Sequence, residues 1–336
     1  MTIEKILNEM VAERVAPGGV LLVSRNGKTV LYESFGMTRY QDDGSRAVTK
    51  DTIYDIASIT KIFTATAALI LADQGEISLD DKLAAFFPRC AYGDKVAVRH
   101  LLTHTSGISS WMARLAEQKP DEIHQAIIQA SLKNKPGAKV EYANVNAYLL
   151  GKIIELVSKK VLNKFFLEKV CRPLEMKETF FNPPGAFFER IAPTEITKDW
   201  RLIIGWAHDE SAYALGGVAG HAGLFSAAED LNRLCRMWLN GDQILSERLK
   251  KSALLKQISG DSVGFGLGWM IDCDWMGKMR KHIAGHTGFT GPMIALAPEY
   301  SLSVVLLMNS TYPQRTDRYK KWEYYEKIID ILFENL

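Results

Sequence analysis

The pattern of hydrophobic and polar positions changes its period several times along the first quarter of the chain. Apolar residues at helical spacing near the N-terminus predict an amphipathic helix that stops at Pro17. Two β-rich runs, VLLV and TVLY, then surround Asn26-Gly27, a dipeptide that strongly favours a tight hairpin turn. From Ser58 to Gln74 the pattern is helical again, and Gly75 is well placed to end that helix.

The middle of the chain has mostly helical patterns, and strand patterns return toward its end. Residues 76–260 contain helical segments separated by turns, except for 197–225, which is rich in Gly and weakly periodic. We expect 197–225 to be a long functional loop. Strand-like runs follow after residue 262, and a final helix places Trp322, Tyr325 and Ile329 on one side.

This order of elements predicts an α/β (α+β) fold with one antiparallel sheet assembled from both ends of the chain. Residues 1–57 and 262–336 are expected to form the α/β domain, in which the sheet is flanked by the N- and C-terminal helices. Residues 58–261 are expected to form an inserted, mainly helical domain. Any active site then lies at the interface between the two domains.

Composition narrows the class of protein. The chain has 336 residues, of which 47% are hydrophobic and 24% charged, as in an ordinary globular protein. A net charge of +2 gives no indication of a nucleic-acid partner. No apolar stretch is long enough to predict a membrane span. The N-terminus lacks a signal-peptide pattern, so the sequence as given predicts a cytoplasmic protein, or a periplasmic or extracellular one if a leader was removed.

The cysteines and histidines predict neither a disulfide framework nor a metal site. Four cysteines are widely scattered, without a CxxC pair, and are expected to be reduced thiols. His208, Asp209, Glu210 and His221 lie in the Gly-rich segment, but their spacing matches no zinc pattern. We interpret them as loop architecture, with His221 a weak candidate for a substrate contact. No cofactor is expected.

The segment Ser58-Ile59-Thr60-Lys61 is the first candidate for chemistry. Residues i and i+3 share one face of a helix, so the Lys61 side chain can reach the Ser58 hydroxyl. A serine hydroxyl becomes a good nucleophile only when a neighbouring base takes its proton. Alone, S-x-x-K is most often an exposed Ser and Lys on a helix. Here the apolar sequence on both sides predicts that the pair begins a buried helix.

Two further segments supply groups that complement this pair. Tyr142 can pass protons, and Asn144 can both donate and accept hydrogen bonds to a substrate amide. His286-Thr287-Gly288 lies at the end of an expected strand, where Gly288 lets a substrate approach the backbone. Each segment alone has an ordinary explanation: Tyr142 as a core aromatic, and the His-Thr pair as strand surface. His104, in the THTSG segment, is expected to bond loop backbone.

Taken together, the three segments resemble the motifs of the class C β-lactamase and penicillin-binding-protein superfamily of serine hydrolases. That family has S-x-x-K, then Y-x-N, then K-T-G or H-x-G, which here stand at 58–61, 142–144 and 286–288. The segments LLTHTSGI, YANVNAYLLG and GFGLGW are also similar to the family, and the resemblance covers roughly residues 15–312. It implies a β-lactamase/transpeptidase-like fold.

The resemblance also implies roles for individual residues. Ser58 would form an acyl-enzyme, with Lys61 and Tyr142 moving its proton, and Asn144, His286 and Thr287 would bind substrate. The backbone N–H groups of Ser58 and Phe289 would form an oxyanion hole, next to Gly288. The substrate is then a small amide, ester or β-lactam. Separately from the resemblance, we expect a monomer or weak oligomer.

The chain departs from the β-lactamases at the start of the third motif, where His286 replaces lysine. Lysine is a permanent positive charge for a substrate carboxylate, whereas histidine is largely neutral near pH 7. The histidine therefore disfavours efficient β-lactam hydrolysis. Three activities remain open: a D-Ala-D-Ala carboxypeptidase-like hydrolase, a carboxylesterase of the same fold, and a penicillin-binding sensor that acylates with little turnover.

Overall fold

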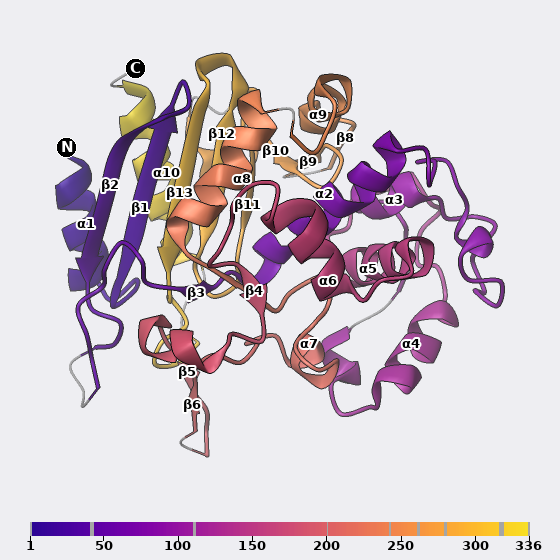
Figure 1. Cartoon of the computed structure of the whole chain (residues 1–336), viewed down its shortest axis with the longest axis horizontal. Coiled ribbons are helices and arrows are strands. Elements are labelled where there is room, and N and C mark those ends of the chain that lie inside the picture. The colour runs from indigo at the N-terminus through magenta and orange to yellow at the C-terminus, as the bar shows by residue number, and fades with distance from the viewer. Residues whose placement is uncertain are drawn as a thin grey trace.

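A computed structural model of the chain describes residues 2–334, apart from 41–43, 110–111, 200, 242, 261–262, 279–280 and 316–318. An eight-stranded antiparallel sheet organises the molecule, in the order β2-β1-β13-β12-β11-β10-β9-β8. Its strands are β1 (Gly18–Arg25), β2 (Lys28–Gly36), β8 (Ile258–Ser259), β9 (Gly264–Phe265), β10 (Met270–Ile271), β11 (Ala284–Thr287), β12 (Met293–Ala297) and β13 (Leu302–Met308). The first and last strands of the chain are neighbours, which confirms the predicted sheet built from both termini (Figure 1).

The central strands are apolar on both faces because helices cover both sides of the sheet. Val20 and Leu22 of β1 pack into the core shared with the helical half, whereas Leu21 and Val23 pack into a second core under the terminal helices. Successive side chains of a strand point to opposite faces. When both faces are covered, every side chain of the strand is buried, and apolar residues are favoured at every position. This explains the uninterrupted VLLV run.

The helices fall into two groups. On one face of the sheet lie the two terminal helices, and α8 packs on the other face against β1, β12 and β13 (Figure 1). These are α1 (Ile3–Ala12), α10 (Lys320–Glu334) and α8 (Ala228–Asn240). The remaining helices are α2 (Thr60–Asp73), α3 (Val98–Leu102), α4 (Pro120–Ile128), α5 (Asn144–Ser158), α6 (Leu162–Phe166), α7 (Glu210–Ala214) and α9 (Glu247–Leu254).

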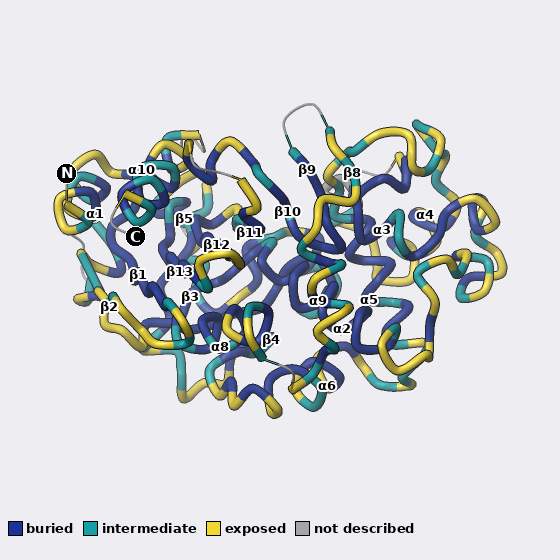
Figure 2. The backbone as a smooth tube through the Cα atoms, turned by 90° about the horizontal axis from the view of Figure 1, so that it is seen from above, coloured by how far each residue is buried: buried dark blue, intermediate teal, exposed yellow. Residues whose placement is uncertain are grey.

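Helix α2 is the central helix of the second group. Every residue from Thr60 to Leu71 is buried, and its hydrophobic positions are not restricted to one side. A helix that is apolar all round belongs in the interior. It contacts α5 and α6. Figure 2 shows the buried central strands, with exposed segments toward the periphery.

Two short sheets complete the fold near the start of α2. One has the order β3-β7-β4, formed by β3 (Tyr54–Asp55), β7 (Leu224–Ser226) and β4 (Phe180–Phe181). The other pairs β5 (Glu195–Ile196) with β6 (Leu202–Ile203). The expected long loop at 197–225 therefore contains β6, α7 and the start of β7. It is ordered by local elements that are too short to leave a periodic pattern.

The predicted division into two domains stays a prediction. Its boundary at 261/262 lies outside the described residues. One hydrophobic cluster extends from Leu22 and Val305 of the sheet to Phe63 of α2 and Ile153 of α5. The sheet and the helical group therefore share a continuous interior. Within the described ranges, no helix combines the length and the apolar character needed to cross a membrane.

Candidate active site

Ser58 lies in a 3₁₀ turn, Ala57–Ile59, that leads directly into α2. Ala57 has a φ of 45°, a left-handed conformation that costs a non-glycine residue roughly 1–2 kcal/mol. The Asp55 carboxylate stabilises this turn, because its two oxygens accept hydrogen bonds from the backbone N–H groups of Ala57 and His208, both at 2.8 Å. Burial raises the pKa of Asp55 although these bonds oppose the rise. The turn leaves Ser58 half-buried at the wall of a cleft.

Lys61 lies behind Ser58 and is only 3% exposed. Its Nζ donates a hydrogen bond to Ser58 Oγ at 3.0 Å and another to the backbone carbonyl of His221 at 2.9 Å. A buried ammonium group is stable only with such partners. The i, i+3 spacing predicted the first contact. The second comes from a residue 160 positions away, and no local pattern indicates it.

Tyr142 is the point at which the three sequence segments meet. The Lys61 Nζ lies 5.1 Å from the centroid of the Tyr142 ring, and the His286 ring centroid lies 5.8 Å from it. The rings of His104 and Phe265 flank Tyr142 at centroid distances of 4.7 and 6.5 Å. His104 also accepts a hydrogen bond from the backbone N–H of Ala143, so its expected role in bonding loop backbone is confirmed.

Asn144 and His221 are tied together by Asp209. The Asn144 side chain donates to Asp209 Oδ2 at 3.3 Å, and His221 Nε2 lies 3.2 Å from Asp209 Oδ1. Oδ1 also accepts hydrogen bonds from the Ser211 hydroxyl and from the backbone N–H of Ala212, which caps α7. Burial acts to raise the pKa of Asp209, but these hydrogen bonds outweigh it and hold the pKa well below its usual range.

His221 is fully buried, so it supports the site through its backbone carbonyl rather than through contact with a substrate. The Gly220 carbonyl beside it accepts a hydrogen bond from the Thr64 hydroxyl at 2.6 Å. A side chain at Gly220 would meet the carbonyl oxygen of Ala147 at 2.2 Å. The Gly-rich segment thus lies directly against α2 and α5, which explains the small residues there.

His286, expected from the sequence to contact substrate, lies in the interior, and its role in substrate binding stays a prediction. It is fully buried in β11, and its Nδ1 donates to the Thr287 carbonyl at 2.9 Å. Burial and the neighbouring Lys61 ammonium group lower the pKa of His286 to about 3. The imidazole is therefore neutral at pH 7 and offers no positive charge to a substrate carboxylate. Side chains alternate along a strand, so Thr287, rather than His286, faces the cleft.

The cleft beside Ser58 has a volume of about 380 Å³ and a largely apolar wall. Five of the eight predicted site residues line it: Ser58, Tyr142, Thr287, Gly288 and Phe289. Its remaining lining was not predicted: Val263, Met270, Cys273, Asp274, Trp275, Tyr319, Lys321 and Trp322. Most of these come from the segment after β10 and from the start of α10. No local signal marks them, because only the packing of the C-terminal helix brings them to the end of β11.

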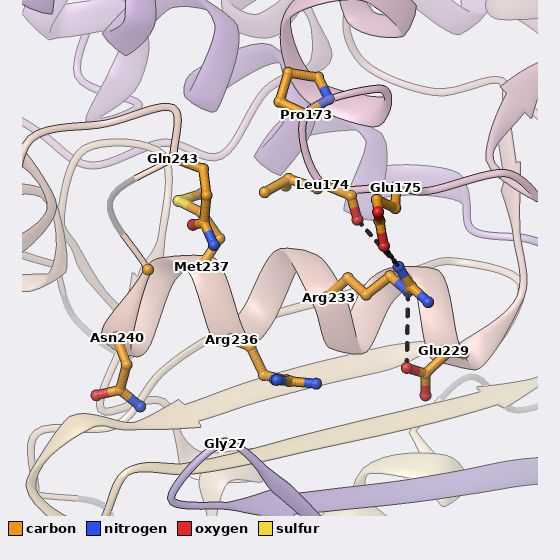
Figure 3. A pocket seen from close by; sticks show the side chains of 11 residues that line it. Gly27, Pro173, Leu174, Glu175, Glu229, Arg233, Arg236, Met237, Asn240 and Gln243 are labelled. Atoms are coloured by element: carbon orange, nitrogen blue, oxygen red, sulfur yellow. Dashed lines mark hydrogen bonds and ion pairs between the residues drawn. The ribbon is translucent and has the colours of Figure 1, made fainter.

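A separate hollow of about 490 Å³ lies between α8, the turn at Gly27 and residues 173–175. Arg233 of α8 forms ion pairs there with Glu175 at 3.1 Å and with Glu229 at 3.7 Å (Figure 3). The charges that line this hollow are thus partly neutralised. None of the predicted site residues lies in it. Among the described residues, no three His, Cys, Asp or Glu side chains are grouped as metal ligands would be.

Comparisons with known proteins identify the family and the fold. The family model described as Beta-lactamase matches residues 3–326. A putative D-alanyl-D-alanine carboxypeptidase of Escherichia coli K12 is 29% identical over an alignment that covers 92% of this chain and 82% of that protein. The structure of an octameric penicillin-binding protein homologue from Pyrococcus abyssi superposes with a TM-score of 0.81 at 26% identity, covering 99% of this chain and 78% of the other.

A class C β-lactamase crystal structure has the same fold, with a TM-score of 0.78 at 18% identity over 97% of this chain and 96% of the other. The predicted β-lactamase/transpeptidase-like fold is thereby confirmed. Because the family model spans nearly the whole sequence, the chain belongs to the β-lactamase family of serine hydrolases.

Proposed function

We propose that the protein hydrolyses a small amide or ester through an acyl-enzyme on Ser58. The observation that carries the proposal is the contact of 3.0 Å between Ser58 Oγ and the buried Lys61 Nζ, next to Tyr142 and open to the cleft. A serine hydroxyl needs such a partner to become a nucleophile. Asp55 and the carbonyl of His221 hold this arrangement in place before a substrate binds.

The proposed reaction has two steps. Ser58 Oγ forms a bond to the substrate carbonyl carbon, and the Lys61–Tyr142 pair, in the form that has already given up one of its protons, accepts the hydroxyl proton and delivers it to the leaving nitrogen or oxygen. The bond to the leaving group then breaks and leaves an ester on Ser58. In the second step, water adds to that ester while the same pair takes up a proton from the water. The bond between Ser58 Oγ and the acyl carbon then breaks, the acyl group leaves as a carboxylic acid, and the proton returns to Ser58 Oγ. The N–H groups of Ser58 and Phe289 stabilise the negative oxygen in both steps.

Two observations favour esters or apolar amides as the substrate class. The His286 imidazole is neutral at pH 7, so it supplies no cation for a terminal carboxylate. The described wall of the cleft includes Met270, Trp275 and Trp322, which suit an apolar acyl or leaving group. The similarity to a putative D-alanyl-D-alanine carboxypeptidase supports the alternative, a peptide ending in D-Ala-D-Ala.

Mass spectrometry of the intact protein tests the proposal. We expect p-nitrophenyl acetate or a penicillin to add the mass of one acyl group on Ser58, and we expect Ser58→Ala to abolish both the adduct and hydrolysis. Cleavage of D-Ala-D-Ala mimics would identify a carboxypeptidase, turnover of esters alone an esterase, and a stable penicillin adduct without turnover a sensor. If Ser58→Ala hydrolyses esters as fast as the native chain, Ser58 is not the nucleophile.

A further inference from the structure

Lys321, on the first turn of α10, contacts the backbone at the end of β11. Its side chain is 5% exposed, and its Nζ donates hydrogen bonds to the carbonyl oxygens of Gly288 at 3.3 Å and Phe289 at 2.6 Å. The same Nζ lies 5.7 Å from the centroid of the Phe289 ring. Burying an ammonium group costs free energy unless its protons are hydrogen-bonded. The bonds to these two carbonyls therefore hold both the Lys321 side chain and the backbone at Gly288 and Phe289 in place.

These contacts fix the orientation of one peptide group. The Gly288 carbonyl accepts from Lys321 and also from the backbone N–H of Gly291, at 3.2 Å. The preceding Thr287–Gly288 peptide is held as well, because the Gly288 N–H donates to the Pro292 carbonyl at 2.7 Å. A trans peptide is planar, and its C=O and N–H point in opposite directions. The N–H of Phe289 therefore points away from Lys321 and cannot turn while these bonds persist.

This peptide group lies beside the turn that carries Ser58. A Cβ built on Gly288 would meet the carbonyl oxygen of Ile56 at 2.8 Å, and Ile56 precedes Ser58 by two residues. Ser58, Gly288, Phe289 and Lys321 all line the same cleft. The end of β11 and the 3₁₀ turn are thus in direct contact, and Gly288 permits that contact.

We propose that Lys321 is a positioning residue that orients and polarises the Gly288–Phe289 peptide, and thereby strengthens the Phe289 N–H as a donor to the oxyanion on the substrate. The inference rests on the proposed function, because it assigns a role to Lys321 only in an acyl transfer at Ser58. A cation on a peptide carbonyl draws electron density from the amide, and hydrogen bonds in series strengthen one another.

The expected effect is on the transition state more than on the bound substrate. The carbonyl oxygen of a substrate carries little charge, whereas the oxygen of the tetrahedral intermediate carries nearly a full negative charge. An interaction that is stronger in the transition state raises kcat and leaves KM nearly unchanged. A residue that served only the stability of the fold would not separate kcat from KM in this way.

The test compares Lys321→Met and Lys321→Gln with the native chain, using p-nitrophenyl butyrate as substrate and phenylboronic acid as a tetrahedral analogue that bonds to Ser58. We expect Lys321→Met to lower kcat by about 10- to 100-fold, short of the loss seen when an oxyanion donor is removed outright. KM should stay constant, and the affinity for phenylboronic acid should fall by a similar factor. Lys321→Gln keeps a donor without the charge and should lose less.

The matched control is Lys320→Met, one residue earlier on α10. Lys320 forms an ion pair with Glu13 at 3.1 Å, its side chain is 41% exposed, and it is not part of the cleft lining. Kinetics and boronate affinity should match the native chain. Thermal unfolding followed by circular dichroism is measured for every variant, and if Lys321→Met does not fold, Lys321→Gln decides the question by the same readouts.

The outcomes separate the two proposals. If the native chain shows turnover that depends on Ser58, and the Lys321 variants keep native kcat and boronate affinity, the role of Lys321 is refuted and the proposed function stands. A rise in KM at constant kcat also refutes it, because Lys321 would then bind substrate directly. If the native chain shows no turnover that depends on Ser58, both proposals fall together.

Discussion

The Nζ of Lys61 donates a hydrogen bond of 2.9 Å to the backbone carbonyl of His221, a residue 160 positions later in the chain. This contact joins the first turn of α2 to the Gly-rich segment, and it leaves the Lys61 ammonium group between that carbonyl and Ser58 Oγ. The position of the lysine is therefore set from two sides. Both the reactivity of Ser58 and the conformation of the Gly-rich segment should depend on it.

Removing the amine should remove the activity. Lys61→Met keeps most of the side-chain volume but leaves Ser58 without its hydrogen-bond partner, and we expect kcat/KM for p-nitrophenyl butyrate to fall by about 10²- to 10⁴-fold, the usual contribution of a proton-transfer group. Lys152→Met is the control, because Lys152 pairs with Glu155 on the exposed side of α5. Equal rates in Lys61→Met and the native chain would contradict a proton-transfer role for Lys61.

Asp209 should contribute to stability through its carboxylate. In Asp209→Ala, the Ser211 hydroxyl, the backbone N–H of Ala212 and His221 lose an acceptor, and we expect the free energy of unfolding to fall by about 1–3 kcal/mol. Asp209→Asn keeps an oxygen that can cap α7 and should lose less. Urea unfolding measures both changes. Equal losses in the two variants would show that the negative charge, which both variants lack, outweighs the hydrogen bonds that Asp209→Asn keeps.

The contribution of the Asp209 carboxylate to stability should depend on pH. Its folded pKa lies below the unfolded value, so its stabilising contribution is present above the unfolded pKa and is lost as the pH falls through the folded pKa. The contribution of Asp209 should therefore persist at mildly acidic pH and disappear only in strong acid. The difference between native and Asp209→Asn stability, followed from pH about 6 to about 2, measures this.

Gly288 should tolerate no side chain. The Cβ of Gly288→Ala would lie 2.8 Å from the carbonyl oxygen of Ile56, closer than real contacts allow, so the end of β11 must move away from the Ser58 turn. We expect a large loss of kcat, because a displacement of about 1 Å at reacting groups costs about 100-fold. Gly185→Ala is the matched control, since its Cβ meets no atom within 4 Å. Full activity in Gly288→Ala would exclude an oxyanion donor at Phe289.

His286 should make the protein less stable in acid. Burial and Lys61 lower its pKa to about 3 from the usual 6.5, so between these values the unfolded chain binds the extra proton and the folded chain does not. The free energy of unfolding therefore falls as the pH falls through this window. The pKa of His104 is lowered in the same way, whereas the raised pKa of Asp55 acts in the opposite direction.

A titration series isolates the part due to His286. Urea unfolding of the native chain and of His286→Asn is compared from pH about 7 to about 4, and the variant should lose less stability across that range. The contribution of Asp55 is common to both chains and cancels in the difference. For His104 the larger causes of the lowered pKa, burial and Lys61, are also common to both chains, and only the smaller effect of His286 is removed in the variant. Parallel curves for the two proteins would show that His286 does not titrate differently in the folded and unfolded states.

Local sequence patterns predicted the elements that depend on interactions between residues close together in the chain. Asn26 and Gly27 both have positive φ, of 51° and 74°, as the tight turn between β1 and β2 requires. The helix expected from Ser58 is confirmed, although it begins as a 3₁₀ turn before the α-helix starts at Thr60. The i, i+3 contact of Ser58 with Lys61 also follows from spacing alone.

Contacts between distant segments were not predictable in the same way. The resemblance placed three motifs at one site and predicted a substrate contact for His286, but it gave no indication that the ring is buried beside Lys61. Whether a strand residue faces the cleft or the interior depends on which face of β11 each neighbour covers. A register shift of one residue would move every side chain of the strand to the opposite face, and the hydrophobic pattern of the sequence does not determine this register here.

The amino-acid sequence by itself determined the antiparallel sheet from both termini, the buried α2 and the family to which its motifs are similar, because hydrophobic period and turn chemistry act over a few residues. Only the tertiary structure decided three hydrogen bonds. The His221 carbonyl accepts from Lys61, and Asp209 of the Gly-rich segment accepts from Asn144. Lys321 donates to the backbone just after β11. Each of these contacts joins residues far apart in the chain. Their partners are selected by how whole elements pack, and packing leaves no mark on the local sequence.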